Sequence, residues 1–177
     1  YDLSSAFIKS LRASDPDAAQ YWLARLLLSG EDPVFIARRL IIFASEDIGN
    51  ADPQALTLAT ATMQAAQTIG MPEVRITLGQ AVTYLATAPK SNASYVAINA
   101  AFDCIKSGDL SPIPHYLRTP QSQKMSNDRN KSEYRYPHDY PYSITNQPYT
   151  TTPYTFYHPK PIGFERDIIK RLNWIKE

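Results

Sequence analysis

The chain lacks the features that mark several large classes of protein. Cys104 is the one cysteine in 177 residues, which excludes an intramolecular disulfide framework and fits a reducing compartment. No apolar run approaches the ~18 residues that a membrane-spanning helix needs, so we expect no membrane partner. The six glycines form no G-x-x-x-x-G-K-[ST] phosphate loop, and nucleotide hydrolysis by these residues alone is not expected. The chain also begins at Tyr1 without a starting Met or a signal-like segment, so we expect a piece of a longer protein.

Charge of neither sign dominates the whole chain, but its two halves differ. The totals are 18 Lys and Arg against 17 Asp and Glu, a net charge of +1, so whole-chain electrostatics indicates no polyanionic partner. Residues 1–109 carry a net charge of −3, and residues 110–177 carry +4 together with all three histidines. The second part also holds 9 of the 14 prolines and 8 of the 12 tyrosines. We therefore analyse the two parts separately.

Residues 1–109 are predicted to form an antiparallel bundle of helices. Three Asp-Pro pairs place an N-cap acceptor before a proline at the first helical position, and each of the segments that follow runs to a glycine able to close a helix end, Gly30, Gly49 or Gly70. Apolar residues recur at helical spacing within these segments. A solenoid of single-helix repeats is the alternative, but the apolar content changes from one segment to the next. Helices are expected near residues 2–12, 15–29, 32–48, 52–69, 71–88 and 91–107.

Residues 110–162 are predicted to form a long extended arm, followed by a C-terminal helix over residues 163–177. The arm contains nine prolines and no glycine, and tyrosines are spaced through it. A disordered tail is usually poor in aromatic residues, so we expect the arm to pack on the body or on a neighbouring subunit. Phe164, Ile168, Leu172 and Ile175 make one stripe of an amphipathic helix. The expected whole is one all-α structural domain: a body (1–109), an arm (110–162) and a terminal helix (163–177).

Two short motifs in the body contain charged and polar residues that are candidates for a functional site. Glu46 and Asp47 lie at the end of a predicted helix, where the helix dipole disfavours negative charge unless cations compensate. We expect a charge network with Arg38, Arg39 or Arg25 that ties helices together, and the alternative is a contact with another domain or subunit. The second motif, Lys90-Ser91-Asn92, opens a helix.

The motif at residues 90–92 and the tyrosine-rich arm each allow two interpretations. Ser91 or Asn92 can cap the helix, and Lys90 beside a helix start can also bind an anion. One segment of the arm combines aromatic side chains with a basic residue. It contains Tyr136, His138, Asp139 and Tyr140. Such a segment can pack against protein or stack on nucleotide bases.

The pattern of residues gives little indication of a metal site or of a catalytic nucleophile. His115, His138 and His158 are separated by 23 and 20 residues, unlike a compact ligand motif. Cys104 falls on an apolar helix and is predicted to be a small core residue. A small enzyme built on the histidines and tyrosines of the arm is a third hypothesis, and it requires a polar cleft.

Several stretches, taken in order, resemble the C-terminal part of the replication-associated recombination protein A (RarA/MgsA) family of AAA+ ATPases, which includes the Werner-helicase-interacting protein of eukaryotes. The resemblance covers nearly the whole chain. It departs from bacterial members at residues 125–133, which lack their glycine-rich stretch. The matching stretches are SDPDAAQYWLAR at 14–25, GEDP at 30–33, IARRL at 36–40, ASEDIG at 44–49, YLA at 84–86, APKSNA at 88–93 and HDYP at 138–141.

The resemblance implies a function for the domain and for a longer parent protein. It implies a helical region similar in role to a clamp-loader collar, which follows an AAA+ module and assembles as a homotetramer. ATP and Mg²⁺ would bind in that module, so no cofactor is expected in these residues. The parent would act at stalled replication forks, with DNA and single-strand-binding protein as partners, in the bacterial cytoplasm at the nucleoid. The alternative from the residues themselves is a DNA-binding module that uses the basic, tyrosine-rich second half.

Overall fold

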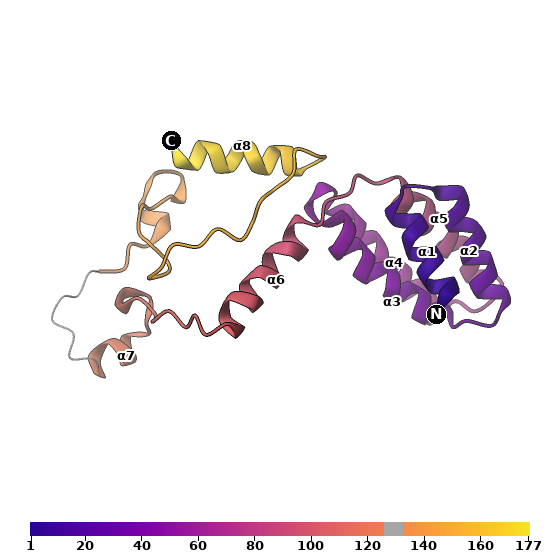
Figure 1. The fold of residues 1–177 in the computed structure, drawn as a ribbon, viewed down its shortest axis with the longest axis horizontal. Coiled ribbons are helices and arrows are strands. Elements are labelled where there is room, and N and C mark those ends of the chain that lie inside the picture. Colours follow the sequence, from indigo (N-terminus) through magenta and orange to yellow (C-terminus); the bar gives the residue numbers. More distant parts are fainter. Residues whose placement is uncertain (126–132) are drawn as a thin grey trace. The chain divides into compact units, whose positions relative to one another are not determined.

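The computed structural model describes residues 1–125 and 133–177, and over those residues the chain is helical without strands (Figure 1). The prediction of an all-α fold is thereby confirmed. The chain forms two compact units, one of residues 1–98 with 157–177 and one of residues 99–156. The segment at 125–133, where the family resemblance is expected to break down, lies almost wholly outside the described residues.

Every helix expected from the sequence is present in the described residues, with ends shifted by a few positions. A short helix inside the predicted arm, α7, was not expected. The helices are α1 (Asp2–Arg12), α2 (Pro16–Leu28), α3 (Pro33–Phe43), α4 (Gln54–Thr68), α5 (Val74–Thr87), α6 (Ala93–Lys106), α7 (Pro120–Met125) and α8 (Glu165–Lys176).

The three Asp-Pro pairs act as helix starts, as the sequence predicts. The carboxylates of Asp15, Asp32 and Asp52 each accept a backbone N–H two or three residues further on, at 3.0, 2.9 and 3.1 Å. These bonds satisfy N–H groups that a helix cannot pair internally. Proline is the first residue of α2 and α3, whereas α4 begins one residue after its proline.

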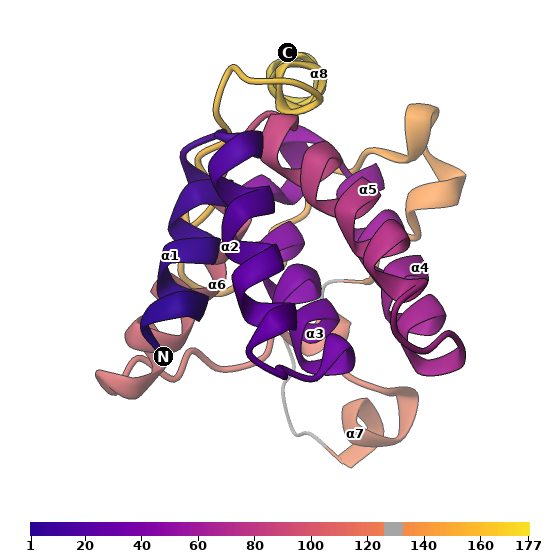
Figure 2. The ribbon, with the colours of Figure 1, turned by 90° about the vertical axis from the view of Figure 1, so that its right-hand side faces the viewer.

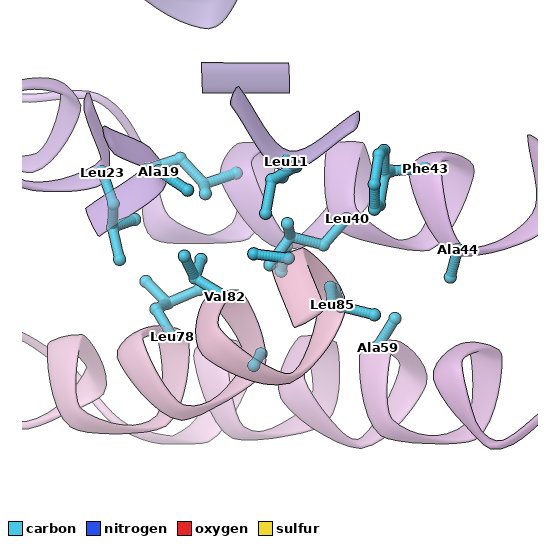
Figure 3. Close-up of a cluster of buried hydrophobic side chains, with 14 of the residues drawn as sticks. Leu11, Ala19, Leu23, Leu40, Phe43, Ala44, Ala59, Leu78, Val82 and Leu85 are labelled. Carbon is cyan, nitrogen blue, oxygen red and sulfur yellow. The ribbon is translucent and has the colours of Figure 1, made fainter. Parts of the chain in front are cut away.

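The core of the first unit is built around α5, which packs against α1, α2, α3 and α4 (Figure 2). Leu78, Val82 and Leu85 of α5 are fully buried and point toward side chains of the neighbouring helices (Figure 3). Gly79 lies on the side of α5 that faces α2, where the Gln20 side-chain amide donates to the Gly79 carbonyl at 2.8 Å. A Cβ added at Gly79 would lie 3.6 Å from the Gln20 side-chain amide, so this glycine is next to a side chain of α2.

The helix predicted over residues 32–48 is not one regular helix. After α3 ends at Phe43, residues Ala44–Ile48 form a π-helical turn and Gly49–Ala51 form a 3₁₀ turn. Gly49 has φ of +52°, a conformation that side chains other than glycine rarely adopt. Residues in π turns depart from the 3.6-residue period, so the sequence pattern could not place this change.

Helix α8 is attached to the first unit by its N-terminal end. Phe164 N donates to Ala51 O at 2.9 Å, and Glu165 is the one residue of α8 that is buried. The Tyr157 hydroxyl donates to Glu165 Oε2 at 2.6 Å, and burial together with this bond raises the pKa of Tyr157 far above its ordinary value. Of the four residues in the predicted apolar stripe of α8, Phe164 and Ile175 are exposed.

The second unit contains most of the predicted arm, and its chain doubles back on itself. Besides α7 it contains three 3₁₀ turns, so the arm is less extended than predicted. The Tyr154 hydroxyl donates to Asp109 Oδ2 at 2.9 Å, and Thr151 Oγ1 donates to Pro112 O at 2.7 Å. These bonds join the start of the arm to residues about 40 positions later.

Candidate functional site

The two polar motifs of the body meet in the first unit, where residues 47–51 lie against residues 90–94. A Cβ added at Gly49 would come within 2.9 Å of Ser91 O, so glycine permits this close approach. Asn50 Nδ2 donates to Ser94 Oγ at 3.4 Å, and the buried Ser91 hydroxyl accepts from Ala93 N at 3.2 Å. Ser91 therefore caps α6, one of the roles that the sequence predicted for it. We call these two segments the polar junction.

The acidic cluster pairs with a cation that the sequence analysis missed. Asp47 accepts from Arg12 Nε at 2.8 Å, and this bond raises the pKa of the Arg12 guanidinium. The prediction of Arg38, Arg39 or Arg25 as partner of Asp47 was wrong, because the end of α1 is 35 residues away in sequence and no periodicity relates the two. The Arg25 guanidinium instead lies 5.6 Å from the centre of the Trp22 ring.

The two arginines of α3 form no ion pair with the acidic cluster within the described residues. Arg38 is exposed. Arg39 lines a groove between α1 and α3 together with Lys9 and Arg12, and its Nε is buried without a hydrogen-bond partner among the described residues. The carboxylate of Glu46 makes no ion pair within the described part of the chain.

Lys90 serves as a C-terminal cap of α5. Its ammonium donates to Ala86 O at 2.9 Å, to Ala88 O and to Ser14 Oγ at 3.1 Å. A cation at the C-terminal carbonyls of a helix complements the helix dipole, and these three bonds use the three ammonium protons. Burial lowers the pKa of Lys90, an effect that the Asp47 carboxylate opposes. Asn92 holds a different lysine, accepting from Lys160 Nζ at 2.8 Å.

The Asp47–Arg12 pair is expected to stabilise the fold, whereas Glu46 is not. We predict that Asp47→Asn lowers the free energy of unfolding by about 1–3 kcal/mol, because it weakens a charged hydrogen bond at a nearly buried carboxylate. Glu46→Gln is the matched control and should leave stability within about 0.5 kcal/mol. Urea denaturation followed by circular dichroism measures both variants, and equal losses at the two positions would contradict the assignment.

An apolar groove lies beside the polar junction, between the α3 side of the bundle and the first turns of α6. Its volume is about 450 Å³. Glu46 is its one charged residue. The groove is lined by Ile41, Ile42, Ser45, Glu46, Ser94, Tyr95 and Ile98.

Helix α6 is unusual in that it buries only one of its fourteen residues, Ala93. Its five large apolar side chains, Tyr95, Val96, Ile98, Phe102 and Ile105, are between 41% and 56% exposed. Isolated exposed hydrophobic residues are ordinary, but a run of them along one helix marks an interaction surface. The sequence analysis described this helix as apolar and predicted that Cys104 is a core residue, but it did not predict that the large side chains are exposed.

Cys104 of α6 is half-buried rather than a core residue. Within the second unit its thiol donates to Asp109 Oδ2 at 3.3 Å. Burial and the neighbouring carboxylate raise the pKa of the Cys104 thiol, which leaves little of the nucleophilic thiolate at neutral pH.

The tyrosine-rich segment of the second unit exposes most of its rings. Tyr136 and Tyr140 are exposed, His138 and Asp139 are exposed as well, and the Tyr136 and His138 rings lie 5.2 Å apart. In contrast, Tyr154 stacks on Phe156 with ring centres 5.2 Å apart. Packing within the chain therefore accounts for the end of the arm but not for the exposed rings of Tyr136, His138 and Tyr140.

A metal-binding cluster and a membrane-spanning helix are both absent from the residues that the structure describes. No group of three or more His, Cys, Asp or Glu side chains is placed to hold a metal ion among them. None of their helices is both long enough and apolar enough to span a membrane.

The fold and the candidate site define an all-helical domain whose distinctive surface is an uncovered apolar helix beside a polar junction. The family model described as "MgsA AAA+ ATPase C terminal" matches residues 13–176. The chain belongs to this family, the C-terminal region of the AAA+ ATPases that the sequence motifs indicated.

Curated relatives agree over nearly the whole chain. Replication-associated recombination protein A of Escherichia coli K12 is 40% identical over 100% of this chain, which covers 40% of that protein. The protein of the same name from Coxiella burnetii is 41% identical, also over 100% of this chain and 41% of its own length. ATPase WRNIP1 of Dictyostelium discoideum is 37% identical over 94% of this chain and 18% of its own length. The chain thus spans about two fifths of these bacterial relatives.

Proposed function

We propose that this chain is the homotetramerisation domain of an AAA+ ATPase that acts in replication-associated recombination. The observation that carries the proposal is the exposure of α6, whose large apolar side chains are left uncovered while the neighbouring helices form a complete core. Such a surface is typical of a contact between subunits, where aromatic and aliphatic side chains form the buried centre. Phe164 and Ile175, two of the four residues of the α8 stripe, are exposed as well and offer a second apolar surface.

Two different surfaces are what a tetramer of dihedral symmetry requires. Such an assembly is built from two kinds of two-fold contact, and a stable contact usually buries more than about 1,000 Å². Among the helices of the described residues, α6 carries the largest group of exposed apolar side chains, and Trp174 and Ile175 of α8 with the adjoining Phe164 are exposed as well. The proposed role is therefore structural, and it would hold four ATPase modules together.

The mass of the domain in solution tests this proposal. We expect residues 1–177 to sediment at about four times the 19.9 kDa of the chain at micromolar concentration. Sedimentation equilibrium or light scattering gives the mass directly. A monomer at that concentration would contradict the proposal.

We propose that the longer protein hydrolyses ATP with Mg²⁺ in a module outside these residues, acts at stalled forks with DNA and single-strand-binding protein as partners, and works in the cytoplasm at the nucleoid. The family membership of this chain and the names of its relatives support this role. Residues 1–177 contain no phosphate loop, so we predict that they neither bind nor hydrolyse ATP. Isothermal titration with ATP and Mg²⁺ should show no binding heat, and stoichiometric binding would contradict the prediction.

A DNA-binding module is the second candidate function, and the exposed tyrosines at 134–142 favour it because nucleotide bases stack on such rings. The local charge argues against it. Residues 133–157 contain one arginine, Arg135, against Glu133 and Asp139, whereas binding to a nucleic-acid backbone depends on clustered cations. Affinity for single-stranded DNA that falls steeply with salt, in a monomeric domain, would place this candidate first.

A further inference from the structure

We propose that α6 pairs antiparallel with α6 of a second copy across a two-fold axis near residue 100, so that Phe102 and Ile105 of each copy enter the apolar groove of the other. This inference rests on the proposed function and specifies which surface carries one of its contacts. It commits to a second copy of this chain as the occupant of the groove. The spacing of the exposed residues, the position of the groove and the charges at its two ends support it.

The spacing of the exposed residues along α6 is symmetric. Tyr95, Ile98, Phe102 and Ile105 are separated by three, four and three positions, the interval at which side chains fall on one face of a helix that packs against another. In an antiparallel pair centred on residue 100, Tyr95 lies opposite Ile105 of the second copy, and Ile98 lies opposite Phe102 of the second copy. The same stripe therefore serves both partners, as a two-fold contact demands.

The apolar groove continues the N-terminal half of this stripe. Tyr95 and Ile98 form its α6 side, and Ile41 and Ile42 form its other side. In the pairing proposed, the residues that reach this groove come from the C-terminal half of α6 in the second copy. That half carries Phe102 and Ile105, each 56% exposed. An aromatic and a branched aliphatic side chain match an apolar groove of this size.

The charges at the two ends of α6 favour the antiparallel direction over the parallel one. Glu46 lines the groove next to Tyr95 and makes no ion pair within the described residues. Lys106 is the last residue of α6 and follows Ile105 directly. Antiparallel pairing brings Lys106 of one copy to Glu46 of the other, twice per dimer. A parallel pair would instead place the two Glu46 carboxylates near each other, where like charges repel.

A lone acidic group in an apolar groove also argues against other occupants. A nucleic acid would bring phosphates toward the carboxylate of Glu46, which has no ion-pair partner within the described residues, and like charges repel. An anionic membrane surface would meet the same repulsion. A second copy of this chain supplies both the apolar side chains and the cation that the groove lacks.

Ile98→Glu and Val96→Glu test the pairing as a matched set. Both positions are on α6, exposed to 53% and 46% respectively, but Val96 is turned about 100° around the helix from Tyr95 and does not line the groove. We expect Ile98→Glu to reduce the solution mass of residues 1–177 to half or less of the wild-type value. Val96→Glu should retain the wild-type mass. Circular dichroism should show that both variants have the helix content of the wild type.

Charge reversal tests the direction of the pair. We expect Glu46→Lys and Lys106→Glu, each alone, to raise the dissociation constant of the contact about 3- to 10-fold, because exposed pairs contribute little individually but each reversal creates two repulsions per dimer. The double variant carrying both changes should return to within about twofold of wild type. A double variant as weak as the single variants would overturn the antiparallel arrangement.

The outcomes separate this inference from the function on which it rests. A wild-type chain that is monomeric would contradict both the proposed tetramerisation and the α6 pairing. A wild-type tetramer whose mass is unchanged by Ile98→Glu removes the α6 pairing and leaves tetramerisation through another surface.

Discussion

Replacing Leu78 with alanine is expected to lower the free energy of unfolding by about 2–5 kcal/mol. Leu78 is fully buried in α5, the helix that packs against four others. The substitution removes apolar surface from the core and leaves a cavity that these helices cannot all close at once. Figure 3 shows the side chain within the cluster.

Ile76→Ala is the control for Leu78→Ala, because it makes a similar change on the same helix at a position that is 64% exposed. Its effect should stay within about 0.5 kcal/mol. Urea denaturation followed by circular dichroism measures both variants, at one protein concentration because assembly adds to apparent stability. Similar losses at the two positions would show that α5 is not the centre of the core.

Gly163→Ala is expected to detach the start of α8 from the bundle, with a loss of about 2–3 kcal/mol. A Cβ at this position would come within 2.2 Å of Ala51 O, so the backbone must move and the bond from Phe164 N to Ala51 O is lost. The left-handed conformation of Gly163, with φ of +55°, adds about 1–2 kcal/mol for any other residue, and the lost hydrogen bond adds about 1 kcal/mol.

Gly30→Ala separates the two causes of the Gly163 effect. Gly30 is also left-handed, with φ of +88°, but a Cβ there meets nothing within 4 Å. We expect Gly30→Ala to lower the free energy of unfolding only by the cost of placing alanine in a left-handed backbone conformation. Amide hydrogen exchange adds the local readout, since protection within residues 165–176 should fall in Gly163→Ala and remain in Gly30→Ala. Unchanged protection in Gly163→Ala would contradict this account of the attachment.

The helical elements could be predicted because their signals are local. An Asp-Pro pair caps a helix through a carboxylate that reaches only two or three residues along the chain, and apolar periodicity is read within one segment. The same locality explains the failure at residues 44–51. A π turn followed by a 3₁₀ turn is set by the packing of Gly49 against Ser91, more than forty positions away.

At the candidate site, too, the sequence indicated the local motifs but not the distant residues that contact them. The sequence singled out the motifs at 44–49 and 88–93 as charged and polar segments, and Ser91 caps a helix as predicted. Their partners were not found, because Arg12 reaches Asp47 only once α1 has packed into the bundle. The exposure of α6 was also missed, since an apolar helix of a core and an apolar helix of an interface share the same sequence pattern.

The sequence by itself determined that this chain is all-α, the approximate positions of every helix except α7, and to which family it belongs, because capping, periodicity and motif order are properties of neighbouring residues. Only the tertiary structure decided that Arg12 pairs with Asp47, that Lys90 caps α5 through its three ammonium protons, and that α6 leaves its apolar side chains uncovered. Burial and ion pairing depend on which distant segments pack together, and that choice is made by the free energy of the whole bundle.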